Sequence, residues 1–101
     1  MIHVVFHPKA SEELEVSIKF YEHREPGLGI DLEREVAEAM LRIQDAPRRW
    51  REHENGARQF LLDRFPFHVV YIELEETLWI VAVAHCSRRP GYWRQRLDDR
   101  P

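Results

Sequence analysis

The sequence has little of what marks disulfide-stabilised, secreted or membrane-spanning proteins. Its 101 residues include a single cysteine, Cys86, which cannot form a disulfide within the chain and is typical of a reducing compartment. No apolar run approaches the roughly 18 residues of a membrane span, and the first residues lack the basic stretch that opens a signal peptide. These absences predict a cytoplasmic protein without membrane association.

An excess of basic charge is also absent. The chain has 15 lysines and arginines against 18 acidic residues, a formal net charge of −3, whereas a domain that binds nucleic acid is usually basic. The charge is nevertheless uneven, because residues 1–46 have five basic and ten acidic residues, while residues 47–101 have ten arginines and eight acidic residues. Either these arginines form an ordinary solvated surface, or they create a local patch for phosphate or carboxylate groups.

Motifs for metal or phosphate binding are missing. The four glycines do not have the spacing of a phosphate-binding loop. Cys86 beside His85 gives too few ligands for zinc, which needs four at a recognisable spacing. Neighbouring strand residues point to opposite faces, so His85 is also poorly placed to activate the Cys86 thiol. We therefore expect no metal site and no cofactor.

The first half of the chain predicts one strand and two helices. Residues 2–6 form a short apolar run that indicates a buried strand, and Pro8 then suits the first turn of a helix. Apolar residues at helical spacing predict an amphipathic helix over residues 9–24 and a second that ends at Pro47. Only residues 25–29 separate the two helices, which predicts an antiparallel helical hairpin.

The second half changes to a strand pattern. Three runs rich in branched and aromatic residues follow a polar loop, at Arg58–Arg64, Phe67–Leu74 and Thr77–Cys86. Short turns separate them, which indicates a three-stranded antiparallel meander packed on the helical hairpin. The whole chain, residues 1–101, is thus predicted to be one α+β domain, in which the tail at residues 94–101 is either flexible or one short helical turn.

The turn at Glu75-Glu76 predicts a register for the last two strands. A two-residue turn pairs Leu74 with Thr77 and, further along, Val70 with Val81 and His68 with Val83. In this register His68 and His85 lie on the same face of the sheet. The other face is predicted to carry Phe67, Val69, Tyr71, Ile80, Ala82 and Ala84.

The segment from His85 to Trp93 has the residues that nucleic-acid chemistry requires. Arg88 and Arg89 can neutralise phosphate bidentately, and Tyr92 and Trp93 can stack on bases. His68 and His85 titrate near neutral pH and could act as the base and acid of a ribonuclease.

An alternative is structural. The two aromatic rings could anchor the chain end to the core, with both histidines as ordinary strand residues. Arg58 and Arg64 either extend the arginine patch or are polar strand ends. The sequence leaves both interpretations open.

Three segments together resemble the RelE/ParE toxin superfamily, and within it the branch known as plasmid stabilisation proteins. They are Arg58–Tyr71, Ile80–His85 and Arg88-Arg89-Pro90-Gly91-Tyr92-Trp93, and the opening Phe6–Ala10 fits the same branch. The resemblance implies the α+β fold and the toxin half of a type II toxin–antitoxin pair. It also implies a cognate antitoxin that inactivates the toxin, hence a toxin–antitoxin hetero-oligomer.

The superfamily includes two mechanisms. RelE-like members cleave mRNA on the ribosome without a metal, and the resemblance would place His68 at the position of a catalytic arginine, Arg88 or Arg89 near a second one, and Tyr92 or Trp93 near the terminal aromatic. ParE-like members inhibit DNA gyrase and lack that set. The absence of lysine from residues 58–64 and the acidic net charge favour gyrase.

Two alternatives to gyrase inhibition remain, a ribosome-dependent endonuclease and a non-toxic relative that only binds an antitoxin. The candidate catalytic residues of the nuclease are His68, His85, Arg88, Arg89 and Tyr92. The candidate residues for binding a target or phosphate are Arg58, Arg64, Arg88, Arg89 and Trp93.

Overall fold

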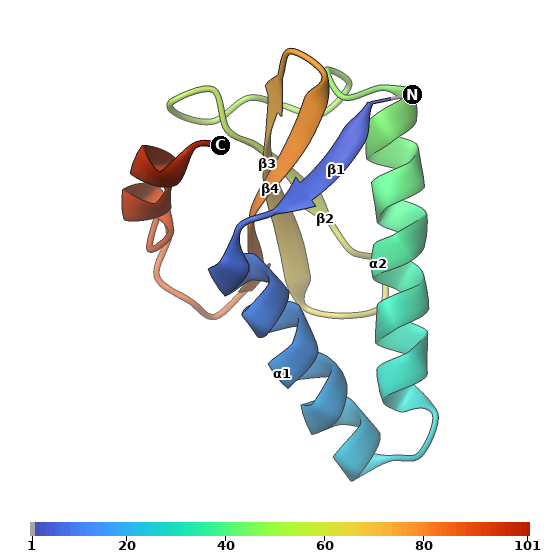
Figure 1. The fold of residues 1–101 in the computed structure, drawn as a ribbon. Helices are drawn as coiled ribbons and strands as arrows, with labels where there is room; N and C mark the ends of the chain where they lie inside the picture. The colour runs from blue at the N-terminus through green and yellow to red at the C-terminus, as the bar shows by residue number, and fades with distance from the viewer. Residues whose placement is uncertain (1) are drawn as a thin grey trace.

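The protein is an α+β domain built on a four-stranded sheet. A computed structural model describes residues 2–101, and its strands lie in the order β1-β4-β3-β2. Figure 1 shows a helical hairpin and a C-terminal 3-10 helix on different sides of this sheet. In chain order the elements are β1 (His3–Phe6), α1 (Pro8–Arg24), α2 (Leu28–Asp45), β2 (Arg58–Leu61), β3 (Phe67–Leu74), β4 (Thr77–His85) and η1 (Arg94–Asp99).

These elements confirm the predicted fold class, with two adjustments. The strand predicted over residues 58–64 ends at Leu61, because residues 62–66 turn toward β3. The N-terminal strand joins the meander, where β1 lies parallel to β4 with His3 opposite Thr77 and Phe6 opposite Ile80. The tail forms η1, so of the two alternatives for residues 94–101 the short helical turn is the one observed. Among residues 2–101 no helix is long and apolar enough to cross a membrane.

Local sequence accounts for the two helices. The His7 side chain caps α1 by accepting a hydrogen bond from the Lys9 amide at 3.0 Å, and Pro8 occupies the first turn. The buried face of α2 follows a helical spacing that the sequence predicted. Its apolar members are Leu32, Val36, Ala39, Met40 and Ile43.

The two helices approach each other closely where the hairpin turns. Glu22 accepts hydrogen bonds from the amides of Gly27 at 2.8 Å and Gly29 at 3.0 Å. A Cβ on Gly29 would overlap the backbone oxygen of Ile18 and lie 2.8 Å from the Cβ of Glu22. Glycine is therefore required at residue 29 by packing, not by backbone conformation.

We expect Gly29→Ala to lower the free energy of unfolding by about 1–3 kcal/mol, the usual cost of overpacking. This loss opposes the helix propensity of alanine, which by itself favours the substitution by about 1 kcal/mol. Urea unfolding measures the change, and Glu33→Ala on the exposed side of α2 is the control, expected to stay within about 0.5 kcal/mol. A Gly29→Ala variant as stable as the control would contradict the close packing.

The sheet has an apolar core on each face. The larger core contains α1, α2 and one side of the strands, and the smaller contains the other side with Trp93 and the partly buried Tyr92 and Leu97. The C-terminal segment therefore covers a face that the helices leave open. The smaller core consists of Ala57, Val70, Ile72, Trp79, Val81, Ala82, Ala84 and Trp93.

A β-bulge in β4 changes the predicted register. Leu74 pairs with Thr77 and Ile72 with Trp79 as predicted, but Tyr71 pairs with Ile80 while Val70 pairs with Ala82. Val81 is thus the extra residue, and every pair beyond it shifts by one position. The predicted pairs of Val70 with Val81 and of His68 with Val83 are wrong for this reason.

The bulge also reassigns the faces of the sheet. His68 now pairs with Ala84, and Phe67 pairs with His85, so the two histidines lie on opposite faces and not on the same face as predicted. The His85 ring packs against Phe67 with centroids 5.0 Å apart. Ala82 and Ala84 belong to the smaller core, away from the face predicted for them.

Candidate functional site

A pocket of about 150 Å³ lies where the C-terminal segment leaves β4. The five residues predicted for nuclease chemistry all line it, together with Gln59 of β2 and the exposed Cys86. Sequence proximity explains most of this grouping, because residues 85–93 are nearly continuous. His68 joins them because β3 is paired with the end of β4. The lining residues from the predicted set are His68, His85, Arg88, Arg89 and Tyr92.

Arg88 and Tyr92 are in close contact at this pocket. The Arg88 guanidinium lies 3.9 Å from the centroid of the Tyr92 ring, a close cation–π contact. The Tyr92 hydroxyl donates a 2.6 Å hydrogen bond to Oε2 of Glu13. Burial, together with this bond to a carboxylate, raises the pKa of Tyr92. The Tyr92 hydroxyl therefore keeps its proton in the hydrogen bond to Glu13 and is poorly suited to proton transfer in a reaction.

The two histidines are placed separately. Burial lowers the pKa of His68, and the nearby His53 lowers it further, so His68 is neutral at physiological pH. Its Nδ1 atom lies 3.9 Å from Sγ of Cys86. His85 instead uses its Nδ1 atom locally, 3.0 Å from the Ser87 amide and 2.7 Å from the Ser87 hydroxyl. The two rings line the same pocket, but they lie on opposite faces of the sheet and their ring nitrogens face different partners.

Trp93 has a structural position. Its side chain is 1% exposed and belongs to the smaller core, although it also lines the pocket. This burial favours the alternative in which Trp93 anchors the chain end, and its contact with a target stays a prediction. Tyr92 beside it is half-buried, with its hydroxyl on α1 and its ring against Arg88.

Arg58 and Arg64 do not extend the patch around Arg88. The Arg58 guanidinium donates to the backbone oxygen of Trp50 at 2.7 Å and lies 3.6 Å from Glu52, so it ties down the loop before β2. Arg64 lies in the turn after β2, with its guanidinium 3.5 Å from Asp31 of α2. The pocket around Arg88 therefore contains neither arginine.

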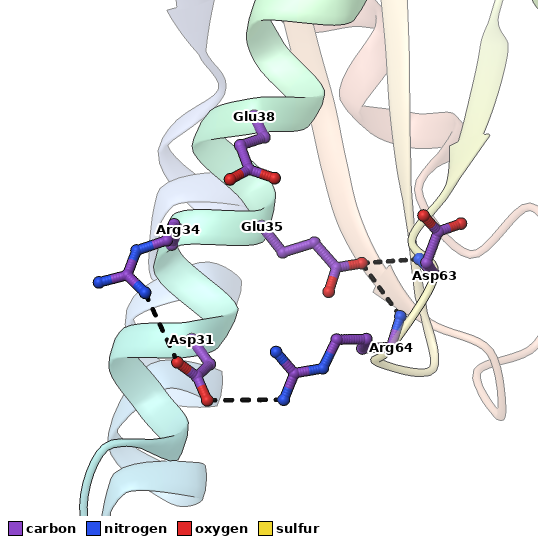
Figure 2. Close-up of a pocket in the computed structure, with 6 residues that line it drawn as sticks. All are labelled: Asp31, Arg34, Glu35, Glu38, Asp63 and Arg64. Atoms are coloured by element: carbon purple, nitrogen blue, oxygen red, sulfur yellow. Dashed lines mark hydrogen bonds and ion pairs between the residues drawn. The ribbon is translucent and has the colours of Figure 1, made fainter.

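The surroundings of Arg64 form a second pocket that carries more acidic than basic residues. Figure 2 shows Arg64 reaching toward Asp31 while Glu35 approaches the backbone of the turn. One oxygen of Glu35 accepts from the amides of Asp63 at 2.6 Å and Arg64 at 3.1 Å. These contacts join α2 to the turn. Within residues 2–101 no group of three or more metal-ligating side chains is placed to hold an ion.

The ion pair between Arg96 and Glu13 is shielded from water and was not predicted from the sequence. Arg96 of η1 donates to both carboxylate oxygens of Glu13 in α1, at 2.9 and 2.8 Å. Burial by itself raises the pKa of Glu13, but hydrogen bonds from Arg96 and Tyr92 outweigh it, so the pKa is lowered and the carboxylate stays ionised. Arg96 stood out only as a member of the arginine cluster, and no local signal links it to a residue 83 positions earlier.

Comparisons with known proteins agree with this fold. Residues 4–90 match the family model described as ParE toxin of type II toxin-antitoxin system, parDE. A chain of the chromosomal ParDE TA system from P. aeruginosa is similar in structure, with a TM-score of 0.74, 19% identity, and 84% of this chain and 96% of that chain covered. The isolated E. coli RelE toxin is also similar, with a TM-score of 0.64, 14% identity, and 99% and 100% covered. No curated protein matches the sequence.

Proposed function

The chain belongs to the ParE toxin family of type II toxin–antitoxin systems, and on this premise we propose that it stops growth by binding DNA gyrase in the cytoplasm. Its partner in such a system is a cognate antitoxin, and in our proposal binding of the antitoxin neutralises it. The observation that carries the choice of target is the placement of His68 and His85 on opposite faces of the sheet. A protein that binds its target needs no paired acid and base.

The ribonuclease alternative requires groups that this pocket holds in other roles. Cleavage of RNA by its own 2′-hydroxyl needs one group to accept a proton and another to donate one. The Tyr92 hydroxyl is bonded to Glu13, and His85 faces Phe67 and Ser87. Among His68, His85 and Tyr92, only His68 is left to transfer a proton, and its lowered pKa favours the neutral imidazole. These roles favour inhibition by binding.

Arg88 and Arg89 are the residues that we assign to target binding. Both are exposed, and within residues 2–101 neither has an ion-pair partner. Arg58, Arg64, Arg94 and Arg96 each face a carboxylate of this chain. A free guanidinium fork can bind a carboxylate or phosphate bidentately, so this pair can engage an acidic surface on gyrase or its bound DNA.

Induced expression tests the proposal in cells. DNA, RNA and protein synthesis are followed separately after induction, and we expect DNA synthesis to fall first and growth to resume when the antitoxin is supplied. Protein synthesis that falls first, with mRNA cut at defined codons, would instead indicate the ribosome-dependent nuclease. Growth without any defect would indicate the non-toxic, antitoxin-binding relative.

The double variant His68→Ala, His85→Ala separates the two mechanisms by mutation. We expect it to retain toxicity within about threefold, because in this proposal the half-buried His68 and His85 side chains make no contact with the target. A nuclease that depends on general acid–base catalysis would lose about 10²–10⁴-fold. Killing curves at matched expression levels measure the difference, and a loss of that size would overturn the binding mechanism.

A further inference from the structure

The outer edge of β4 is completed by side chains where β1 ends. β1 pairs with β4 only as far as Ile80, whose oxygen accepts from the His7 amide at 2.8 Å. Beyond that point the oxygen of Val81 accepts from Arg96 at 3.0 Å, and the amide of Val83 donates to Glu13 at 3.1 Å. The ion pair thus satisfies backbone groups at an edge that would otherwise be open.

The carboxylate of Glu13 is saturated with donors. It accepts two hydrogen bonds from Arg96, one from the Val83 amide and one from the Tyr92 hydroxyl. An ionised carboxylate has about four acceptor sites, so its orientation is fixed from three directions: the backbone of β4, η1 and the segment before η1. The side chains of Glu13 and Arg96 are 15% and 10% exposed, which shields these bonds from water.

Tyr92 links the shielded Glu13 carboxylate to the exposed side chain of Arg88. Its hydroxyl is held by Glu13, and two guanidinium groups lie near its ring, with the ring centroid 3.9 Å from the guanidinium of Arg88 and 5.2 Å from that of Arg96. Arg88 has no other side-chain partner within residues 2–101. Without the ring, its long side chain would sample many rotamers and lose that freedom on binding.

We propose that Glu13 is a positioning residue, which orients the Tyr92 ring and through it holds Arg88 ready to bind the target. The proposal rests on the function assigned above, since it takes Arg88 as a residue that contacts gyrase. Glu13 itself is covered by Arg96 and Tyr92 and contacts no target in this account.

A double-mutant cycle on the 101-residue protein tests the coupling. Gyrase binding is titrated for the wild type, Glu13→Gln, Arg88→Ala and the double variant, at a temperature where circular dichroism shows all four folded. We expect Glu13→Gln to weaken binding about five- to tenfold when Arg88 is present and less than about twofold when it is absent. An equal loss in both backgrounds would show a general structural role and overturn the proposal.

Glu12→Gln is the matched control. It removes the same charge from the neighbouring residue, which is exposed on α1, and we expect binding to change by less than about twofold because it holds no part of the Tyr92 contact. If it weakens binding as much as Glu13→Gln does, the effect comes from net charge, and the positioning role is wrong.

A spectroscopic measurement tests the positioning without a target. The Tyr92 ring should shift the side-chain NMR signals of Arg88 upfield in the wild type and in Glu12→Gln, and Glu13→Gln should move them toward values for free arginine. Unchanged Arg88 signals in Glu13→Gln would overturn the proposal. If the wild type does not bind gyrase but the shift is lost only in Glu13→Gln, the positioning stands and the choice of gyrase fails.

Discussion

Replacing Arg96 with methionine should lower the free energy of unfolding by about 3 kcal/mol, because it leaves the Glu13 carboxylate shielded from water without its charged partner. The same change removes the donor to the Val81 oxygen, which β1 cannot replace. For a domain of about this length the loss corresponds to a fall in Tm of roughly 10–20 °C. Thermal and urea unfolding at neutral pH measure it.

The double variant Glu13→Gln, Arg96→Met distinguishes a lost charge pair from lost packing. Once both charges are gone no uncompensated ion remains, so we expect the double variant to be more stable than Arg96→Met alone. A double variant less stable than the single one would contradict this explanation. So would an Arg96→Met variant that loses less than about 1 kcal/mol.

The double variant Arg88→Ala, Arg89→Ala should reduce target inhibition at least about tenfold, since each charged contact in a protein interface is commonly worth more than 1 kcal/mol. Both residues are exposed, so the free energy of unfolding should change by less than about 0.5 kcal/mol for Arg89→Ala. For Arg88→Ala it should fall by about 0.5–1 kcal/mol, because the cation–π contact with Tyr92 is lost. Inhibition is measured as the concentration that halves gyrase activity, and unfolding is measured in parallel.

The control for this prediction is Arg51→Ala, Arg100→Ala, which removes the same charge from two other exposed positions. We expect it to inhibit gyrase as the wild type does, within about twofold. If both double variants lose potency equally, the arginines contribute only through net charge, by long-range attraction, and Arg88 and Arg89 are not a binding site.

Much of the fold could be predicted because its signals are local. The apolar face of α2 repeats at helical spacing, and glycine and proline mark the ends of both helices. The parallel pairing of β1 with β4 joins segments more than 70 residues apart, and nothing in residues 2–6 specifies that neighbour. The bulge at Val81 lies inside an apolar run, where no glycine or charge marks the extra residue.

The candidate site likewise contains some features that the sequence predicts and others that it does not. Arg88, Arg89 and Tyr92 line one pocket, as their closeness in the sequence leads one to expect, and their role in a site stays a prediction. Arg64 is only six residues from Arg58, yet it lies beside α2 at the other end of β2. His68 and His85 were predicted to lie on the same face of the sheet, but the bulge shifts the register by one residue and places them on opposite faces. The ion pair between Glu13 and Arg96 joins residues that are 83 positions apart in the sequence, so only the folded structure reveals it.

The arginines of the second half fall into paired and unpaired groups. Five of its ten arginines face carboxylates of the same chain and help to hold the domain together: Arg48, Arg58, Arg64, Arg94 and Arg96. Five other arginines have no ion pair among the described residues, and of these we propose that Arg88 and Arg89, which line the pocket, bind the partner. A count of charges cannot make this distinction, because it treats paired and free guanidinium groups alike.

A supercoiling assay with purified gyrase and the purified 101-residue protein tests directly whether gyrase is the target. We predict that supercoiling falls as the protein is added, that the antitoxin restores it, and that Arg88→Ala, Arg89→Ala requires about tenfold more protein for the same effect. Full supercoiling at a large excess of folded wild-type protein would contradict the assignment of gyrase as its target.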